Sequence, residues 1–300
     1  MTTILIANNA AALQAAEPHV TVEAEFGDAV VTGSLLTMAH HGPRAGGKAP
    51  CAYANDCLPT TPGLVIGVSH ADLDTAGGVM AAMGCKPDAP SFWALAEFVD
   101  LNGAHKLGLS GASEEDLRRL YAFWAVSKTV RIYAPRDGTV ADVTADMLKL
   151  TSALKEILRG EGVPYEARLA AGMVFKAQER ALNEDSFVRF ERGVILRHSA
   201  QFVNHLYTTP DGRVAKAVVT WNNGTDLSNG AITASLADPT PGIHVGDLLK
   251  TMFGPEAGGH AGIGGAPRGQ AMPKEVAEKV AFTLGLALGA IGHVKAAGLA

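Results

Sequence analysis

Histidine and aspartate side chains that can bind a metal ion follow the clearest short apolar run of this sequence. Residues 63–69 read GLVIGVS and lead directly into His70, Asp72 and Asp74. Alternate side chains of an extended segment point the same way, so these three can converge on one point. One imidazole and two carboxylates suit a divalent cation such as manganese or magnesium. The plainer interpretation is a solvated turn whose aspartate caps the next helix.

Two more candidates follow the next apolar run, residues 92–99. Asp100 ends this run and can bridge ions held by Asp72 or Asp74, or it can simply cap a turn. His105 follows an Asn-Gly turn and is a candidate general acid for a leaving oxygen.

A pair of adjacent histidines, His40 and His41, follows a presumed strand that ends near Met38. On a strand the two would point to opposite faces unless a turn reorients them. His40 is then a candidate metal ligand, and His41 a candidate acid or phosphate ligand. Arg44 is close enough in sequence for its guanidinium to bind the phosphate through two parallel hydrogen bonds. The alternative is one buried, hydrogen-bonded histidine and one exposed histidine.

A glycine-rich segment near the end of the chain is the fourth candidate. Residues 258–269 read GGHAGIGGAPRG, with six glycines in twelve residues. Gly258 and Gly259 let backbone amides approach an anion closely, and His260 and Arg268 add donors or charge. The segment matches neither the P-loop nor the dinucleotide-binding fingerprint. The alternative is a flexible surface loop.

The elements expected around these residues indicate an α/β fold, because strand, polar turn and helix follow one another over residues 63–83. Other strands are expected at 3–6, 194–196, 202–207, 215–221 and 232–236, with a hairpin or two sheet strands over 20–25 and 29–38. Helices are expected at 9–16, 75–83, 92–99, 113–128, 143–159, 165–182, 246–252 and 274–297.

The length of 300 residues favours two domains, since single cores stop growing at roughly 250–300 residues. The pattern of expected helices and strands changes near residue 188. We therefore expect two lobes: residues 1–188 with a mainly parallel sheet flanked by helices, and residues 189–300 with a smaller mixed-sheet α/β domain.

Composition excludes several classes of protein. The net charge of −5 disfavours a general nucleic-acid binder. Three cysteines without a CxxC pair argue against a disulfide framework and favour the cytoplasm. We recognise no signal peptide at the N-terminus. The late apolar stretch 280–291 is shorter than the roughly twenty residues of a membrane span, so no membrane association is expected.

Together, the segment from His70 to Asp74, the downstream Asp100, the His-His pair and the Gly-Gly-His loop resemble the DHH phosphoesterase superfamily with its DHH-associated C-terminal domain. The resemblance covers roughly residues 60–110 and 190–270. It implies a first lobe that holds two divalent ions, usually manganese, and a second lobe that grips substrate. It also implies metal-ligand roles for His70, Asp72, Asp74 and Asp100, and phosphate binding by His260 and Arg268.

The chain departs from the pattern of that family at one point. The family's Asp-His-His normally follows the HxDxD segment, whereas the His-His pair here precedes it and Ala39 takes the place of the aspartate. The missing carboxylate puts the number of bound ions, and with it catalysis, in question.

The sequence therefore predicts a metal-dependent phosphoesterase that acts on a small phosphoester, a nucleotide or a short oligonucleotide. One alternative is a non-catalytic nucleotide- or phosphate-binding protein that retains the cleft. Another is a single-zinc enzyme that hydrolyses an amide or ester. A homodimer is left open.

Overall fold

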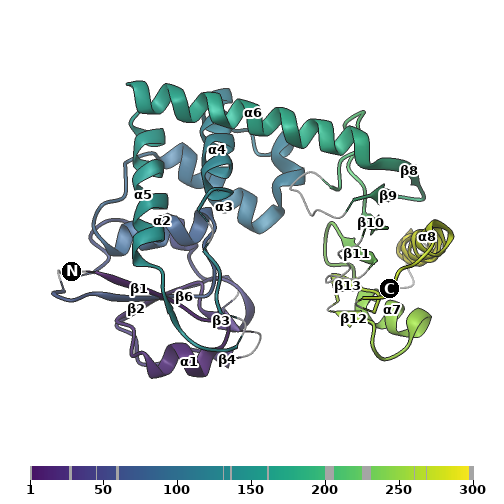
Figure 1. Ribbon diagram of the computed structural model, residues 1–300, viewed down its shortest axis with the longest axis horizontal. Helices are drawn as coiled ribbons and strands as arrows, with labels where there is room; N and C mark the ends of the chain where they lie inside the picture. Colours follow the sequence, from purple (N-terminus) through teal and green to yellow (C-terminus); the bar gives the residue numbers. More distant parts are fainter. Residues whose placement is uncertain are drawn as a thin grey trace. The chain divides into compact units, whose positions relative to one another are not determined.

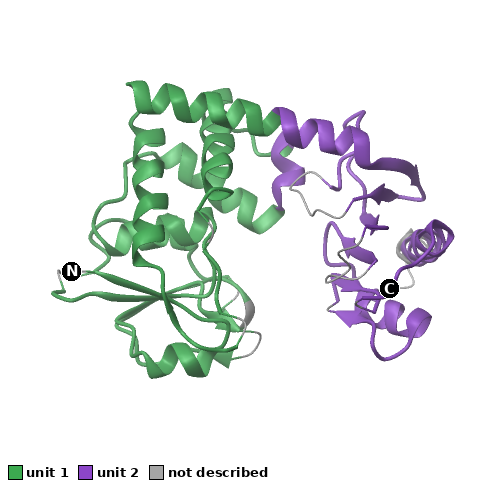
Figure 2. Ribbon diagram, viewed as in Figure 1, with its two compact units in different colours: residues 1–102, 109–176 green, residues 103–108, 177–300 purple. Residues whose placement is uncertain are grey.

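The chain folds into two compact units, which Figure 2 colours separately. Unit 1 comprises residues 1–102 and 109–176, and unit 2 comprises residues 103–108 and 177–300. The computed structural model describes residues 2–26, 29–44, 46–58, 61–130, 132–135, 137–160, 162–199, 206–224, 231–259, 261–267 and 269–296, and for residues 42 and 290–296 it describes the backbone only.

A five-stranded sheet forms the centre of unit 1. Its strand order is β5-β2-β6-β1-β7, with β5 at Leu36–Met38, β2 at Val20–Val22, β6 at Val65–Val68, β1 at Thr3–Ile6 and β7 at Ala141–Asp142. The first four strands run parallel, and β7 runs antiparallel to β1. Central parallel strands are covered on both faces, which explains why Ile4, Ile6, Ile66 and Val68 are fully buried.

Helices cover both faces of this sheet (Figure 1). The helices of unit 1 are α1 at Ala10–Ala15, α2 at Leu73–Ala82, α3 at Pro90–Asn102, α4 at Glu114–Ser127 and α5 at Thr144–Arg159, with 3-10 turns η1 at Gly42–Arg44 and η2 at Pro50–Ala52. Helix α1 packs Leu13 on one face, against Gly67 of β6. Helices α2 and α5 contact the sheet from the side opposite α1.

Unit 2 is built on a six-stranded mixed sheet. Its order is β12-β13-β11-β10-β9-β8, with β12 at Gly258–Gly259, β13 at Ile263–Gly265, β11 at Ile232–Leu236, β10 at Ala217–Trp221, β9 at Val194–His198 and β8 at Phe187–Glu191. Only β9 and β10 are parallel among these described pairs. Alternate residues face opposite sides: Val194 and Leu196 join a core with helices α7 (Val245–Phe253) and α8 (Lys274–Ala296), while Ile195 joins a second cluster.

Helix α6, at Val163–Ser186, belongs to both units, because the division at residues 176 and 177 falls inside it. The 3-10 segment η3, at Ala104–Leu109, also crosses the division. Residue 188, where we placed the domain boundary from the sequence, lies in β8, the first strand of the second sheet.

The predicted fold class, α/β with a mainly parallel sheet and a separate mixed sheet, is confirmed. Residues 20–25 and 29–38, for which a hairpin or two sheet strands were expected, contain both: β2 and β5 lie in the main sheet, and residues 25–30 form a small antiparallel hairpin of β3 (Glu25–Phe26) and β4 (Ala29–Val30). One local expectation differs from the structure. The glycine-rich segment forms paired strands β12 and β13 instead of only a loop, because its backbone groups extend the sheet beside β11. Residues 202–205 of one expected strand lie outside the described residues.

Among the helices of the described chain, none combines the length and the apolar character that crossing a lipid bilayer requires.

Candidate metal centre

Parallel strands bring four acidic and histidine side chains to one edge of the sheet of unit 1. Glu23 follows β2, the pair His40 and His41 follows β5, and His70 follows β6 shortly after its end. Because β2, β5 and β6 are parallel, their carboxyl ends lie side by side. Two helices add carboxylates at the same place: Asp74 from the first turn of α2 and Asp100 from the last turn of α3.

His40 lies at the centre of this group. Its Nε2 atom is 2.9 Å from Oδ2 of Asp100, 3.1 Å from Oδ2 of Asp74 and 3.6 Å from Oε1 of Glu23. The His40 side chain is only 2% exposed, as deeply buried as the carboxylates of Asp74 and Glu23 around it. One imidazole nitrogen therefore faces three carboxylates in an environment closed to bulk water.

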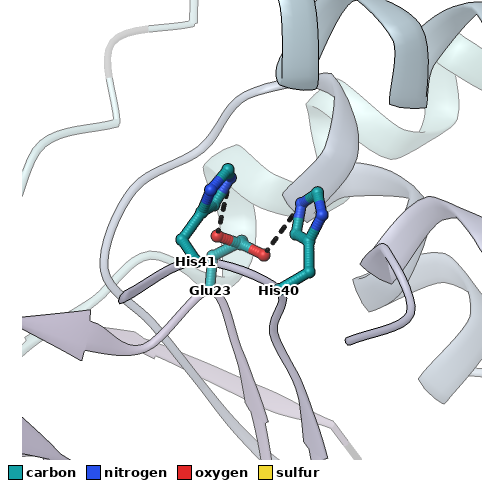
Figure 3. Close-up of side chains that lie close together, drawn as sticks. All are labelled: Glu23, His40 and His41. Carbon is teal, nitrogen blue, oxygen red and sulfur yellow. Dashed lines mark ion pairs between the residues drawn. The ribbon is translucent and has the colours of Figure 1, made fainter. Parts of the chain in front are cut away.

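The neighbouring His41 turns toward the same carboxylates. Its Nε2 is hydrogen-bonded to Oδ2 of Asp100 at 2.8 Å and lies 3.7 Å from Oε2 of Glu23. Figure 3 shows the Glu23 carboxylate with one oxygen toward each imidazole. The two rings do not point to opposite faces, because the chain leaves β5 and enters η1 directly after His41, and their centroids are 4.2 Å apart.

The side chains form two groups in which three ligand atoms lie within 4.8 Å of one another: Glu23, His40 and His41, and His40, Asp74 and Asp100. Within the described residues, Oε1 of Glu23, Nε2 of His40 and Oδ2 of Asp74 are buried yet make no hydrogen bond. Buried polar atoms are normally satisfied, and those that are not require an explanation. Imidazole and carboxylate donors aimed at one another without hydrogen bonding fit a divalent cation.

The pKa values of the buried carboxyl groups also fit a site for a divalent cation. Burial raises the pKa of Glu23 from 4.5 to about 8, and the charges of Asp74 and Glu25 add to this rise. Burial also raises the pKa of Asp74, although a hydrogen bond from Cys51 opposes the rise. Carboxylates crowded into a buried site resist ionisation together, and a divalent cation reverses that tendency.

The backbone around the site holds these carboxylates in place. Glu23 adopts a positive φ of 49°, which ends β2 and turns the side chain toward His40. Asp74 is fixed from the other side, because its Oδ1 accepts a hydrogen bond of 2.7 Å from the backbone N–H of Cys51 in η2. Gly77 permits this approach: a Cβ atom there would lie 2.7 Å from Cβ of Cys51 and 2.9 Å from the Trp93 ring.

The side chains of His70 and Asp72 do not reach the point where Asp74 meets His40 and Asp100. Helix α2 begins at Leu73, so the alternation expected of an extended segment ends at Asp72, which becomes the N-cap and accepts the N–H of Thr75. Nε2 of His70 lies 3.3 Å from Oδ2 of Asp72, and the two side chains are 50% and 42% exposed. Neither residue belongs to the ligand groups found in the described chain.

The charges of His70 and Asp72 nevertheless reach the buried cluster. Desolvation lowers the pKa of His70, but the hydrogen bond and charge of Asp72, with the charges of Glu23 and Asp100, raise it overall. Desolvation raises the pKa of Asp72, but its interactions with His70 and Thr75 lower it overall. The charges of His70 and Asp72 therefore neutralise one another at the border of the cluster.

The other predicted site residues have different surroundings. Arg44 is paired with Glu25 at 3.3 Å, so its guanidinium is already engaged by a carboxylate. His105 lies in unit 2, where its ring centroid is 4.6 Å from that of Tyr207. Gly258 and Gly259 form β12. His260 and Arg268 lie outside the described residues.

Glu23 and Cys51 were missed by sequence reasoning. Glu23 was included in the expected strand 20–25, although an acidic residue directly after the apolar run of β2 is the same signal that singled out His70 after β6. Cys51 acts through its backbone N–H, and no pattern of side-chain types could have indicated that contact.

The fold and the cluster define an α/β protein with a candidate metal centre at the carboxyl edge of a parallel sheet. Among solved structures, the chain is similar to a pGpG-specific phosphodiesterase, PggH from Vibrio cholerae, at 14% identity and a TM-score of 0.37, over 78% of this chain and 81% of that chain. This likeness assigns neither a family nor an activity. No family model matches the sequence, and no curated protein matches it.

Proposed function

We propose that this protein is a divalent-metal-dependent phosphoesterase and a divergent member of the DHH phosphoesterase superfamily. The observation that supports the proposal most directly is the buried convergence of Glu23, His40 and Asp74, whose facing atoms make no hydrogen bonds within the described residues. Sites of clustered carboxylates and imidazoles are typical of metal-assisted hydrolysis. The sequence motifs that resemble the superfamily supply four of the residues of the cluster: His40, His41, Asp74 and Asp100.

Four side chains would hold the metal: Glu23, His40, Asp74 and Asp100. When bound, manganese or magnesium ions supply a positive charge that polarises a phosphoryl oxygen and lowers the pKa of water. Glu23 and Asp74 must lose their protons before binding a cation, since burial favours their neutral forms. One oxygen of Asp74 accepts the hydrogen bond from Cys51, and the other faces His40. These two contacts hold the carboxylate in place before a ligand binds.

His41 has the position of a proton donor. Its side chain is 44% exposed, so it faces both the buried cluster and the solvent side from which a substrate enters. The hydrogen bond to Asp100 orients the ring. We assign His41 the role of protonating the leaving oxygen. His70 and Asp72, which border the cluster, would complete a second cation position.

The second unit would contribute to substrate binding. In this proposal residues 1–188 form the metal-binding domain and residues 189–300 the domain that binds substrate phosphate. Gly258 and Gly259 would offer backbone amides, with His260 and Arg268 beside them. His105 and Arg44 keep their proposed roles as a second acid and a phosphate ligand. The substrate is a phosphate-containing small molecule or a short oligonucleotide.

The test is hydrolysis of bis(p-nitrophenyl) phosphate and short oligonucleotides by protein that is first stripped with a chelator and then supplied with manganese, magnesium or zinc. We expect manganese to restore turnover most effectively, and Asp74→Asn to remove it. Glu114→Gln, an exposed change in α4, is the matched control. Tight nucleotide binding without turnover would favour the non-catalytic alternative. One zinc per chain with ester or amide cleavage would contradict the proposal.

A further inference from the structure

A cavity of unit 1 lies beside the candidate metal centre. It has a volume of about 490 Å³, within the range that binding sites for small organic ligands occupy. Its lining combines the aromatic side chains of Tyr53 and Trp93 with alanines and prolines, and its polar groups include Lys86 and Glu97. A mostly apolar cavity with a few polar groups is suited to a flat heterocycle with a hydrogen-bonding edge.

Two connections tie this cavity to the metal centre. Cys51 lines the cavity, and its backbone N–H binds Asp74 of the cluster at 2.7 Å. Glu97 and Asp100 are three residues apart on α3, so they lie on the same side of the helix, roughly 4.5 Å apart along its axis. Glu97 lines the cavity and Asp100 belongs to the cluster. The cavity and the cluster are therefore neighbours that share η2 and α3.

The walls of the cavity are held in a fixed shape. The ammonium of Lys86 donates to the backbone carbonyls of Cys51 and Tyr53 and lies 4.7 Å from the centre of the Trp93 ring. The side chain of Asn55 exchanges two hydrogen bonds with the backbone of Lys86. These contacts join η2 to the chain before α3. The cavity thus exists before a ligand binds.

Two carboxylates line the cavity, and Asp88 is exposed to solvent whereas Glu97 is partly buried, so Glu97 is the better-placed acceptor for a ligand in the cavity. No hydrogen bond or ion pair of its carboxylate is found among the residues that the structure describes, whereas Lys86 and Asn55 already have partners. An ionised carboxylate only accepts hydrogen bonds and binds two adjacent N–H donors best. Among the common nucleobases, guanine carries such a pair, at N1 and N2, while adenine, cytosine and uracil place an acceptor beside their donor.

We infer that the cavity of Tyr53, Trp93 and Glu97 binds a guanine base of the substrate, with the Glu97 carboxylate accepting hydrogen bonds from its N1–H and N2–H groups. The inference rests on the proposed function for the position of the phosphate. The cavity itself can be tested without catalysis, because a guanine nucleoside lacks the phosphate that the metal centre would bind.

The experiment is titration of the full-length, metal-free protein with guanosine, adenosine, cytidine and uridine, followed by calorimetry and by tryptophan fluorescence. We expect guanosine to bind at least about tenfold more tightly than the other three. The change Glu97→Gln should weaken guanosine binding by about 10- to 100-fold, since hydrogen bonds to a charged group are lost. Trp93→Phe should remove the fluorescence change, because Trp93 lines the cavity. Glu114→Gln, exposed in α4, should bind guanosine as the unchanged protein does.

Equal binding of all four nucleosides, no binding of any, or guanosine affinity that is unaltered by Glu97→Gln would overturn the inference. Hydrolysis of bis(p-nitrophenyl) phosphate is measured on the same preparations. Turnover of this base-free diester without guanosine binding would leave the proposed function intact and reject the guanine site. Guanosine binding without turnover of any diester would support the guanine site and reject the proposed hydrolysis.

Discussion

Two groups of histidine and aspartate lie close together in unit 1, yet their environments differ. In the buried cluster, His40 faces Glu23 and Asp74 with atoms that make no hydrogen bond within the described residues. In the half-exposed pair, His70 and Asp72 satisfy one another, and Asp72 also caps α2. The same residue types thus form an unsatisfied site in one place and a completed structural motif in the other.

The difference teaches that residue type and spacing alone do not identify a metal ligand. Asp72 and Asp74 are two positions apart, but the start of α2 between them sends one carboxylate to solvent and the other to the core. Burial without a hydrogen bond is the stronger signal, because an unsatisfied polar group costs more in the interior than at the surface. Four predictions test this contrast.

The largest effect is expected from Asp74→Asn in the buried cluster. Loss of this carboxylate should weaken manganese binding by more than about 100-fold, since even outer-shell changes cost roughly 10- to 100-fold. Calorimetric titration of the stripped protein measures the affinity directly. A variant that binds manganese like the unchanged protein would remove Asp74 from the metal centre.

The next effect concerns His41, which lies between the cluster and solvent. We expect His41→Gln to lower kcat by about 10²- to 10⁴-fold, the usual contribution of a general acid. Manganese affinity should change much less. The loss should shrink when the leaving group is p-nitrophenolate, which needs no proton. An equal loss for every leaving group would argue against proton donation by His41.

A third effect is expected in the pH dependence of stability. The pKa of Glu23 is raised from 4.5 to about 8 in the folded protein, so the folded state retains a proton that the unfolded state releases between these values. Unfolding free energy must therefore fall as the pH rises through this window. We expect the melting temperature of the metal-free protein to drop by roughly 5 °C or more from pH 5 to pH 8.

The control for this pH effect is Glu23→Gln. It should flatten the decline without abolishing it, because the raised pKa of Asp74 acts in the same direction. Saturating manganese should reverse the decline, since binding requires the ionised carboxylates. A metal-free melting temperature that rises over this range would contradict the assignment of Glu23 to a buried, neutral state.

The smallest effect is expected from the half-exposed pair. Asp72→Ala removes the N-cap of α2 and should cost about 1 kcal/mol of stability. Asp72→Asn keeps the cap and removes only the charge. Manganese affinity should change less than about tenfold in Asp72→Asn, because Asp72 is not among the converging ligands. A loss as large as that of Asp74→Asn would place Asp72 within the metal centre.

Local patterns in the sequence were sufficient for much of the fold. The strand β6 and the helix α4, which Ser113 caps, lie where they were expected, because burial and capping are encoded by neighbouring residues. For residues 20–25 and 29–38 the sequence left open a hairpin or two sheet strands, and the structure contains both: the sheet strands β2 and β5 and the separate hairpin of β3 and β4. Whether a short segment joins the main sheet or forms a separate hairpin depends on strand partners that are distant in sequence.

For the site, the sequence indicated His40, Asp74 and Asp100 but not how they meet. Glu23 was counted as part of the expected strand 20–25, and its positive φ depends on the tertiary structure. The engagement of Arg44 by Glu25 could not be foreseen, since the two are 19 positions apart and meet where β3 contacts η1 in the folded chain.

The absence of a side chain at position 77 has a consequence for how this protein can change over time. Any methyl group there would push α2 away from Cys51 and Trp93 together. A single substitution would thus disturb the carboxylate of the cluster and the wall of the neighbouring cavity in one movement. In a saturation library screened for a working protein, we expect position 77 to accept glycine and little else, even though its own atoms touch no ligand.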